Sequence, residues 1–169
     1  GTFFSCHAFI TRSAAITSSL YSLSCWMASF RAQTKTDNGI VAFYNASDLT
    51  FISQITVGAL PDMLIFTADQ QSVLVANEGE PSNDYQIDPE GSVSIINIKN
   101  IKNPTIKTAD FKSFNGQEKL LKQTGIRIYG PNATAAQDFE PEYISLSKDA
   151  SRSKNTALSF INVVTASFI

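Results

Sequence analysis

The strongest constraint on the fold is the regular alternation of short apolar runs and turn residues that begins at Asp37. Turn signals separate the runs IVAFYN, FISQITVG, MLIFT and VLVAN, and a spacing of about 8–12 residues from turn to turn is typical of β-sandwiches and β-propellers. Every second residue from Phe51 to Val57 falls on one face of a strand. The sequence therefore predicts an all-β chain, with strands and turns over 39–109 and 140–165 and no helix longer than about three turns.

An internal repeat favours a propeller over a sandwich. Three segments share an apolar strand with an Asn-containing turn: GIVAFYN at 39–45, GSVSIINI at 91–98 and TALSFINVV at 156–164. Two others, LPDMLIFTADQQ at 60–71 and EPEYISLSKDAS at 140–151, place Pro and an acid before an apolar strand. Repeats of about 40–50 residues with four strands are typical of propeller blades. The expected fold is an incomplete β-propeller of about two to three blades of the YVTN/WD40 type.

Two segments depart from the repeat. Residues 110–138 are inserted in the second copy, and GQEKLLKQ at 116–123 has a pattern that fits one or two turns of helix. The stretch from Ser13 to Phe30 carries no charge but holds seven Ser or Thr, which makes it a poor transmembrane span. It is either a targeting segment or a poorly ordered, divergent N-terminus. The predicted division is therefore a segment 1–35 and a partial propeller 36–169.

Charge is unevenly distributed, although the net charge is only −2 and gives no reason to expect a nucleic-acid partner. Between Lys35 and Lys99 there are nine Asp or Glu and no Lys or Arg, whereas seven basic residues lie from Lys99 to Arg127. An acidic half followed by a basic segment can form ion pairs within the fold or face different partners. Pairing within the fold is the expected outcome.

The segment NEGEPSNDYQIDPEG, from Asn77 to Gly91, concentrates five carboxylates between two predicted strands: Glu78, Glu80, Asp84, Asp88 and Glu90. A second acidic group follows in QDFEPEY, with Asp138, Glu140 and Glu142. Clustered carboxylate and carbonyl oxygens bind calcium, and an EF-hand is excluded because its loop pattern is absent. Two interpretations remain open, a solvated acidic loop and a calcium site made from these eight residues. We expect the five loop acids to be mostly solvent-accessible, with at least two converging.

Four segments resemble the choice-of-anchor I domain: TVGALPDML, VLVANEGEPSNDYQIDPEGSVSIINI, TADFKSFNG and GIRIYGPNATAAQDFEPEYISLSKD. That family is similar to the mesenchyme-specific cell-surface glycoproteins of echinoderms, and some bacterial members are labelled alkaline phosphatases. The resemblance covers about residues 36–149. It implies an extracellular or cell-surface β-propeller, attached by an anchor that varies between members, with calcium-linked or matrix-binding functions. No catalytic residue set comes with the family.

The C-terminal part departs from the family pattern. Only ASRSK separates Asp149 from NTALSFINVV, where the family would place another strand, so a whole strand is expected to be lost. Few strands remain before Ile169, and an open set of blades would leave unpaired edges. The sequence therefore looks like a fragment of a propeller.

Two functions follow, from different classes. The first is a non-catalytic surface module that binds calcium, matrix or another protein. The alternative is a calcium-dependent phosphohydrolase in which Lys119, Lys122 and Arg127 contact phosphate. The only histidine, His7, lies outside the region of resemblance, and no nucleophile stands out, so the sequence leans against an enzyme. The sequons NAS at 45–47 and NAT at 132–134 fit a glycoprotein.

Overall fold

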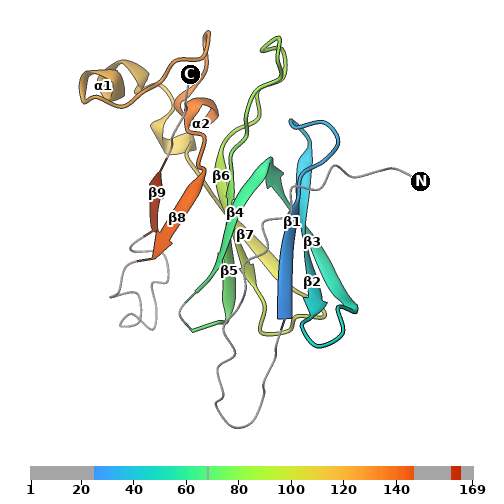
Figure 1. Ribbon diagram of the computed structural model, residues 1–169. Coiled ribbons are helices and arrows are strands. Elements are labelled where there is room, and N and C mark those ends of the chain that lie inside the picture. Colours follow the sequence, from blue (N-terminus) through green and yellow to red (C-terminus); the bar gives the residue numbers. More distant parts are fainter. Residues whose placement is uncertain (1–24, 68, 147–160, 165–169) are drawn as a thin grey trace.

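Three antiparallel sheets form the protein in a computed structural model that describes residues 25–67, 69–146 and 161–164 (Figure 1). The first sheet has the order β1-β2-β3, with β1 at Cys25–Phe30, β2 at Asn38–Asn45 and β3 at Phe51–Ala59. The second has the order β4-β5-β6-β7, with β4 at Pro61–Phe66, β5 at Ser72–Asn77, β6 at Ser92–Asn97 and β7 at Thr105–Asp110. The third pairs β8 (Tyr143–Leu146) with β9 (Ile161–Val164).

The helical elements are short and lie between β7 and β8. They are the 3-10 helix η1 (Lys112–Phe114), α1 (Glu118–Gln123) and α2 (Ala135–Asp138). The predicted short helix in 116–123 is therefore confirmed, as is the all-β character of 39–109 apart from the undescribed residue 68. No helix of the described residues is long and apolar enough to cross a membrane.

The three sheets pack face to face in chain order, with the second sheet in the middle. Strand β5 shows why, because every residue from Val73 to Asn77 is buried. Val73 and Val75 face the first sheet, whereas Leu74 and Ala76 face the third, as the two-residue period of a strand requires. A strand covered on both faces reads as a continuous apolar run, which explains the VLVA segment.

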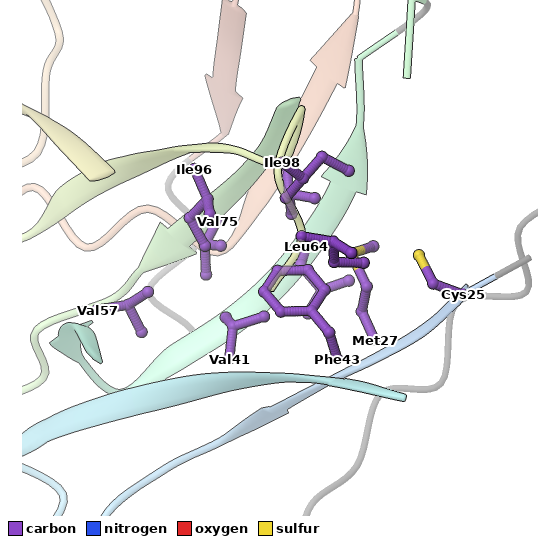
Figure 2. Close-up of a cluster of buried hydrophobic side chains, with 11 residues drawn as sticks. Cys25, Met27, Val41, Phe43, Val57, Leu64, Val75, Ile96 and Ile98 are labelled. Carbon is purple, nitrogen blue, oxygen red and sulfur yellow. The ribbon is translucent and has the colours of Figure 1, made fainter. Parts of the chain in front are cut away.

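The larger core lies between the first and second sheets (Figure 2). Phe43 on β2 is fully buried and lies beside Met27 of β1 and Leu64 of β4. The smaller core joins the second sheet to the third and contains Ile144 of β8. Each interface therefore buries apolar side chains from two successive sheets, which supplies the main stabilisation of the packing.

The N-terminal boundary of the sheet region differs from the predicted division at residue 35. Strand β1 pairs with β2 along its whole length, from Cys25 opposite Asn45 to Phe30 opposite Ile40. An ordered strand therefore lies within the stretch for which the sequence suggested a targeting or divergent segment. Residues 1–24 are outside the described part of the chain.

The third sheet pairs two strands that the repeat would keep apart. By sequence, β8 corresponds to β4, and β9 corresponds to β6. In the second sheet β5 lies between β4 and β6, whereas β8 pairs directly with β9. The expected loss of one strand concerns the ASRSK segment, which lies outside the described residues, and it stays a prediction. The described residues form no closed ring of sheets, so the observed architecture is all-β and open.

The strands have two different ends (Figure 1). At one end, here called the turn end, short turns join β2 to β3, β4 to β5 and β6 to β7. At the other, the loop end, lie the β1–β2 connection, the acidic loop 78–91 between β5 and β6, and the insertion that carries α1 and α2. The site residues predicted from the sequence lie at the loop end.

Candidate functional site

The start of the acidic loop is fixed by backbone hydrogen bonds to the preceding strand connection. The Glu78 amide donates to the Leu60 carbonyl at 2.9 Å, and the Gly79 amide donates to the Ala59 carbonyl at 3.2 Å. Gly79 has a φ of 73°, a left-handed conformation that glycine adopts without steric cost. These contacts hold Glu78 next to the beginning of β4, where Asp62 lies.

A buried polar contact supports the end of β5. The Asn77 side-chain amide donates to the hydroxyl of Ser94 at 2.8 Å and to that of Ser92 at 3.1 Å, and all three residues are buried. These hydrogen bonds offset the cost of burying the amide nitrogen and the two hydroxyl groups, whereas Asn77 Oδ1 is buried and accepts no hydrogen bond. They also join β5 to β6 at the two strand ends from which the acidic loop departs.

Glu78 is the most perturbed carboxyl group at this end. Its pKa is raised to about 7, first because burial disfavours the charged form and then because other carboxylates repel it. The contributing acids are Glu80, Asp62, Glu142 and Glu140. Burial also raises the pKa of Asp62, and burial with repulsion from Asp62 raises that of Glu142. The loop, β4 and the segment before β8 therefore bring their carboxylates within electrostatic reach of one another.

Three of the other predicted ligands are held by contacts of their own. Glu80 forms an ion pair with Lys35 at 3.0 Å, and Glu90 forms one with Lys112 at 3.1 Å. Asp138 accepts hydrogen bonds from the backbone amides of Tyr129 and Gly130. The expected pairing of acidic and basic segments within the fold is thus observed for Glu90 with Lys112.

The tip of the loop is a local turn. Asp84 accepts from the Ser82 hydroxyl at 2.7 Å and from the Gln86 amide at 3.2 Å, and these hydrogen bonds lower its pKa. Asp84 is exposed, whereas the other four loop acids are only partly exposed. The expectation of a mostly accessible loop therefore holds fully for Asp84 alone, because the base of the loop packs against other segments.

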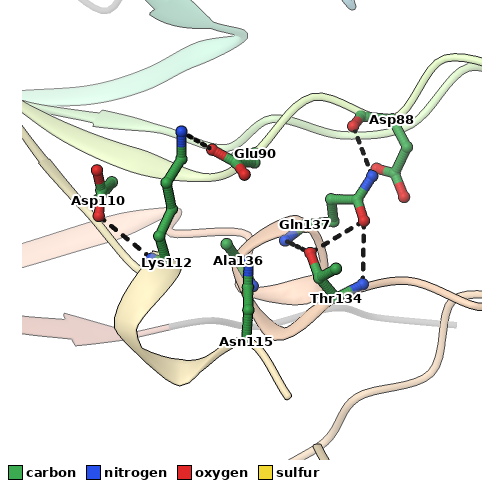
Figure 3. Close-up of polar contacts among 8 residues, drawn as sticks. All are labelled: Asp88, Glu90, Asp110, Lys112, Asn115, Thr134, Ala136 and Gln137. Atoms are coloured by element: carbon green, nitrogen blue, oxygen red, sulfur yellow. Dashed lines mark hydrogen bonds and ion pairs between the residues drawn. The ribbon is translucent and has the colours of Figure 1, made fainter. Parts of the chain in front are cut away.

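The far side of the loop contacts the insertion (Figure 3). The Gln137 side-chain amide donates to the Asp88 carbonyl at 3.0 Å, and the Gly91 amide donates to the Ala136 carbonyl at 2.9 Å. Burial, together with repulsion from Asp138, raises the pKa of the Asp88 carboxyl group. Asp88 and Asp138 therefore form a second pair of neighbouring acids, separate from the Glu78 group.

The eight predicted calcium ligands do not form one cluster. Glu78, Glu80, Glu140 and Glu142 interact electrostatically, Asp88 lies near Asp138, and Asp84 and Glu90 are elsewhere in the loop. Across residues 25–67, 69–146 and 161–164, no three His, Cys, Asp or Glu side chains are arranged to hold a metal ion.

Sequence reasoning missed Asp62 as a site residue. The sequence did contain a signal for it, because Pro61-Asp62 at the start of β4 and Pro141-Glu142 just before β8 occupy equivalent positions in the two repeats.

A cleft of about 630 Å³ also opens at this end, between residues 31–36 and the loop tip at Ser82–Asp84 and Ile87. It places the β1–β2 connection beside the acidic loop.

Comparison with known families identifies the chain. The sequence model of the choice-of-anchor I domain matches residues 8–161, which is most of the chain. The chain belongs to the choice-of-anchor I domain family. No curated protein and no solved structure matches it. The family match also includes the residues of β1, which agrees with the place of that strand in the first sheet.

Proposed function

We propose that this choice-of-anchor I chain is part of a cell-surface or extracellular β-propeller, and that its loop end binds a matrix or protein partner. The observation that carries the proposal is the approach of Asp62 and Glu142. They are equivalent residues of two repeats, they lie at the starts of β4 and β8, and β4 contacts β8. Successive blades of a propeller present equivalent inner-strand positions to a common axis in this way.

Cellular fractionation tests the location. The full-length parent protein, expressed in its own host, should be recovered with the cell surface or the medium and should be digested by protease added to intact cells. A cytosolic protein of the same host serves as the control for lysis. Recovery of the intact protein only from the cytosol would contradict the proposal.

Calcium is the cation that we propose for the carboxylates at the start of the loop. Glu78, Asp62 and Glu142 disfavour one another's negative charge, and a divalent cation would relieve that repulsion. Because no three ligands are preformed in the described part of the chain, binding would require these side chains to rearrange. Calcium at 100 times its Kd would stabilise the fold by about 2.7 kcal/mol.

The melting temperature in calcium and in chelator tests this part. We expect calcium to raise it in the natural protein and to have a smaller effect in Glu78→Gln. Asp69→Asn at the turn end is the matched control and should respond as the natural protein does. An equal melting temperature in calcium and chelator would leave only the solvated-loop interpretation.

Binding is better supported than the phosphohydrolase alternative. The cations expected to contact phosphate lie on or after α1, and the guanidinium Cζ of Arg127 lies 5.1 Å from the centre of the Tyr129 ring. The acids nearest to this region have structural contacts, as Asp138 does with two backbone amides. These contacts give the phosphohydrolase alternative no support beyond the family resemblance.

A glycan is proposed at one of the two sequons. Asn132 is exposed in a turn with a φ of 62°, whereas Asn45 is partly buried and its Oδ1 accepts from the Ser47 amide and hydroxyl. In a eukaryotic secretory pathway we expect a glycan on Asn132. Asn132→Gln should remove a mass shift that is sensitive to glycosidase, and Asn45→Gln should not. A shift that persists in Asn132→Gln would contradict this assignment.

A further inference from the structure

The insertion exposes an unusual group of apolar side chains at residues 116–130, here called the insertion lobe. Leu120 is 57% exposed, Ile126 is 41% exposed and Tyr129 is 73% exposed. The helix α1 within this lobe buries none of its residues. In Figure 1 α1 lies at the edge of the molecule, away from the three sheets. The lobe therefore presents apolar groups on a projection that a large partner can reach.

The lobe is held in this position by contacts at both of its ends. Glu118 Oε1 accepts from the Gly116 amide at 2.9 Å and from the Ala135 amide at 3.0 Å. At the other end Ile128 is buried, and Asp138 accepts from the amides of Tyr129 and Gly130. The exposure of the apolar side chains is thus fixed by the structure, which lowers the entropic cost of binding.

The exposed apolar groups are accompanied by positive charge. Lys119 and Lys122 lie three residues apart on α1, on either side of Leu120 in sequence, and both are exposed. Among the described residues neither lysine is within ion-pair distance of a carboxylate, although Lys122 interacts electrostatically with Glu118, which is bonded to two backbone amides. The lobe therefore combines cationic and apolar groups, which is typical of segments that lie at a membrane interface.

We propose that the insertion lobe docks onto an anionic phospholipid bilayer. Lys119 and Lys122 would contact lipid phosphates, while Leu120 and Ile126 would enter the boundary between headgroups and acyl chains. Tyr129 would lie at the headgroup level, where its ring and hydroxyl are both accommodated. An anionic polysaccharide would use the lysines but not the apolar side chains, so a bilayer accounts for more of the surface. This docking does not depend on whether the sheets belong to a propeller.

A second exposed apolar pair provides a matched control. Leu49 is 64% exposed and Phe51 is 57% exposed, at the turn end of the molecule. Their neighbour Asp48 is an acid, and no lysine is present between Lys35 and Lys99. Within its own turn this pair has the apolar character of the lobe beside an acid in place of lysines, so it is the control for exposed apolar surface.

Co-sedimentation with vesicles tests the proposal on the full chain. The probes are phosphatidylcholine vesicles with and without phosphatidylglycerol, at low and high salt. We expect binding to the anionic vesicles, weakened by salt. The double variant Lys119→Gln with Lys122→Gln should weaken vesicle binding about 25-fold, because each lysine contributes about fivefold to the affinity. Leu120→Ser with Ile126→Ser should weaken it about tenfold or more.

Two control variants distinguish the lobe from general charge and apolar effects. Lys102→Gln with Lys107→Gln removes the same charge from another exposed region, and Leu49→Ser with Phe51→Ser removes comparable apolar surface. Both should bind as the natural protein does, and circular dichroism should show all variants folded. The proposal is overturned by absence of vesicle binding, by equal loss in the controls, or by equal binding to neutral vesicles. Binding to an anionic polysaccharide or acidic protein in place of vesicles would also overturn it.

Discussion

At the turn end, Asp48 and Asp69 are stabilised in their charged form, whereas at the loop end Asp62, Glu78, Asp88 and Glu142 are destabilised in it. Asp69 accepts from the Thr67 hydroxyl at 2.6 Å and from the Gln71 amide at 3.0 Å, and these bonds lower its pKa. Asp48 is held in the same way by Thr50, and its pKa is also lowered. Glu78 at the loop end is instead partly buried among other acids, and its pKa is raised.

This difference shows that contacts local in sequence hold the acids of the turn end, whereas packing between sheets brings those of the loop end together. Each turn-end acid bonds to residues within two positions of itself, so its role is local and concerns the shape of the turn. The loop-end acids come from β4, the acidic loop and the segment before β8, and they meet only because the sheets pack. Groups arranged at a cost to stability are typical of functional sites, which is why the loop end is the candidate site.

The largest expected effect tests whether tertiary packing holds the loop end. A Cβ at Gly91 would lie 1.8 Å from the Phe139 carbonyl oxygen and 2.7 Å from Pro141 Cδ. Gly91→Ala should therefore separate the base of the acidic loop from residues 139–141 and lower the free energy of unfolding by about 3 kcal/mol. Urea unfolding measures the change.

Gly116→Ala is the control for this prediction. Gly116 has no atom within 4 Å of an added Cβ but has a φ of 82°. Its substitution should cost only about 1 kcal/mol through backbone strain. Equal costs at the two glycines would show that packing against residues 139–141 does not hold the loop.

The next largest effect tests whether the charged form of Glu78 destabilises the folded protein. Because its folded pKa of about 7 lies above the usual value of 4.5, the folded state binds more protons between these pH values. Stability should therefore fall as pH rises from about 4.5 to 7. Glu78→Gln should gain about 1–2 kcal/mol at pH 8, less than the full shift implies because water screens the group. The gain should vanish near pH 4, and a loss at pH 8 would contradict the interpretation.

A smaller effect tests whether Glu142 contributes to this repulsion. Removing its charge in Glu142→Gln should lower the pKa of Glu78 from about 7 towards its usual value. The accompanying gain in stability at pH 8 should be under about 1 kcal/mol. Side-chain NMR titration of Glu78 follows the change. Asp84→Asn at the loop tip is the control, and an equal response to both variants would mean that the two repeats do not meet.

The smallest effect has the opposite sign and lies at the turn end. The pKa of Asp69 is lowered in the fold, so its contribution to stability is present at neutral pH and is lost as pH falls through the folded pKa. Asp69→Asn should lower stability at pH 7 by no more than about 0.5 kcal/mol, because the group is exposed and the amide oxygen still accepts hydrogen bonds. Thermal unfolding at pH 7 and pH 3 checks it. A gain at pH 7 would remove the contrast between the two ends.

Much of the fold could be predicted because its signals are local. Residues that are neighbours in sequence determine the turns around Asp48 and Asp69 and the alternation in β3. The repeat identified the segments that form β2 and β6 as equivalent strands of successive units. A short helix was expected where α1 forms. The strand β1 was missed because its sequence, CWMASF, does not alternate apolar and polar residues, and pairing with β2 determines it instead.

The candidate site was predictable only in part. The acidic loop was evident from composition, but Asp62 lies 16 positions before Glu78 and was named only as part of a repeat. Glu90 was predicted as a calcium ligand, which stays a prediction, and its ion pair with Lys112 from beyond β7 was not foreseen. Such partners depend on how the sheets stack, and no local pattern records that.

The sequence by itself determined the strands and turns from residue 39 to residue 109, the family and the acidic composition of the loop. Each of these depends on residues close together in the chain or on similarity along its length. Only the tertiary structure decided that Asp62, Glu78 and Glu142 repel one another while Glu80 and Glu90 are neutralised by lysines. The physical reason is that Coulomb energy and desolvation depend on distance and burial in space, and packing between the sheets sets both.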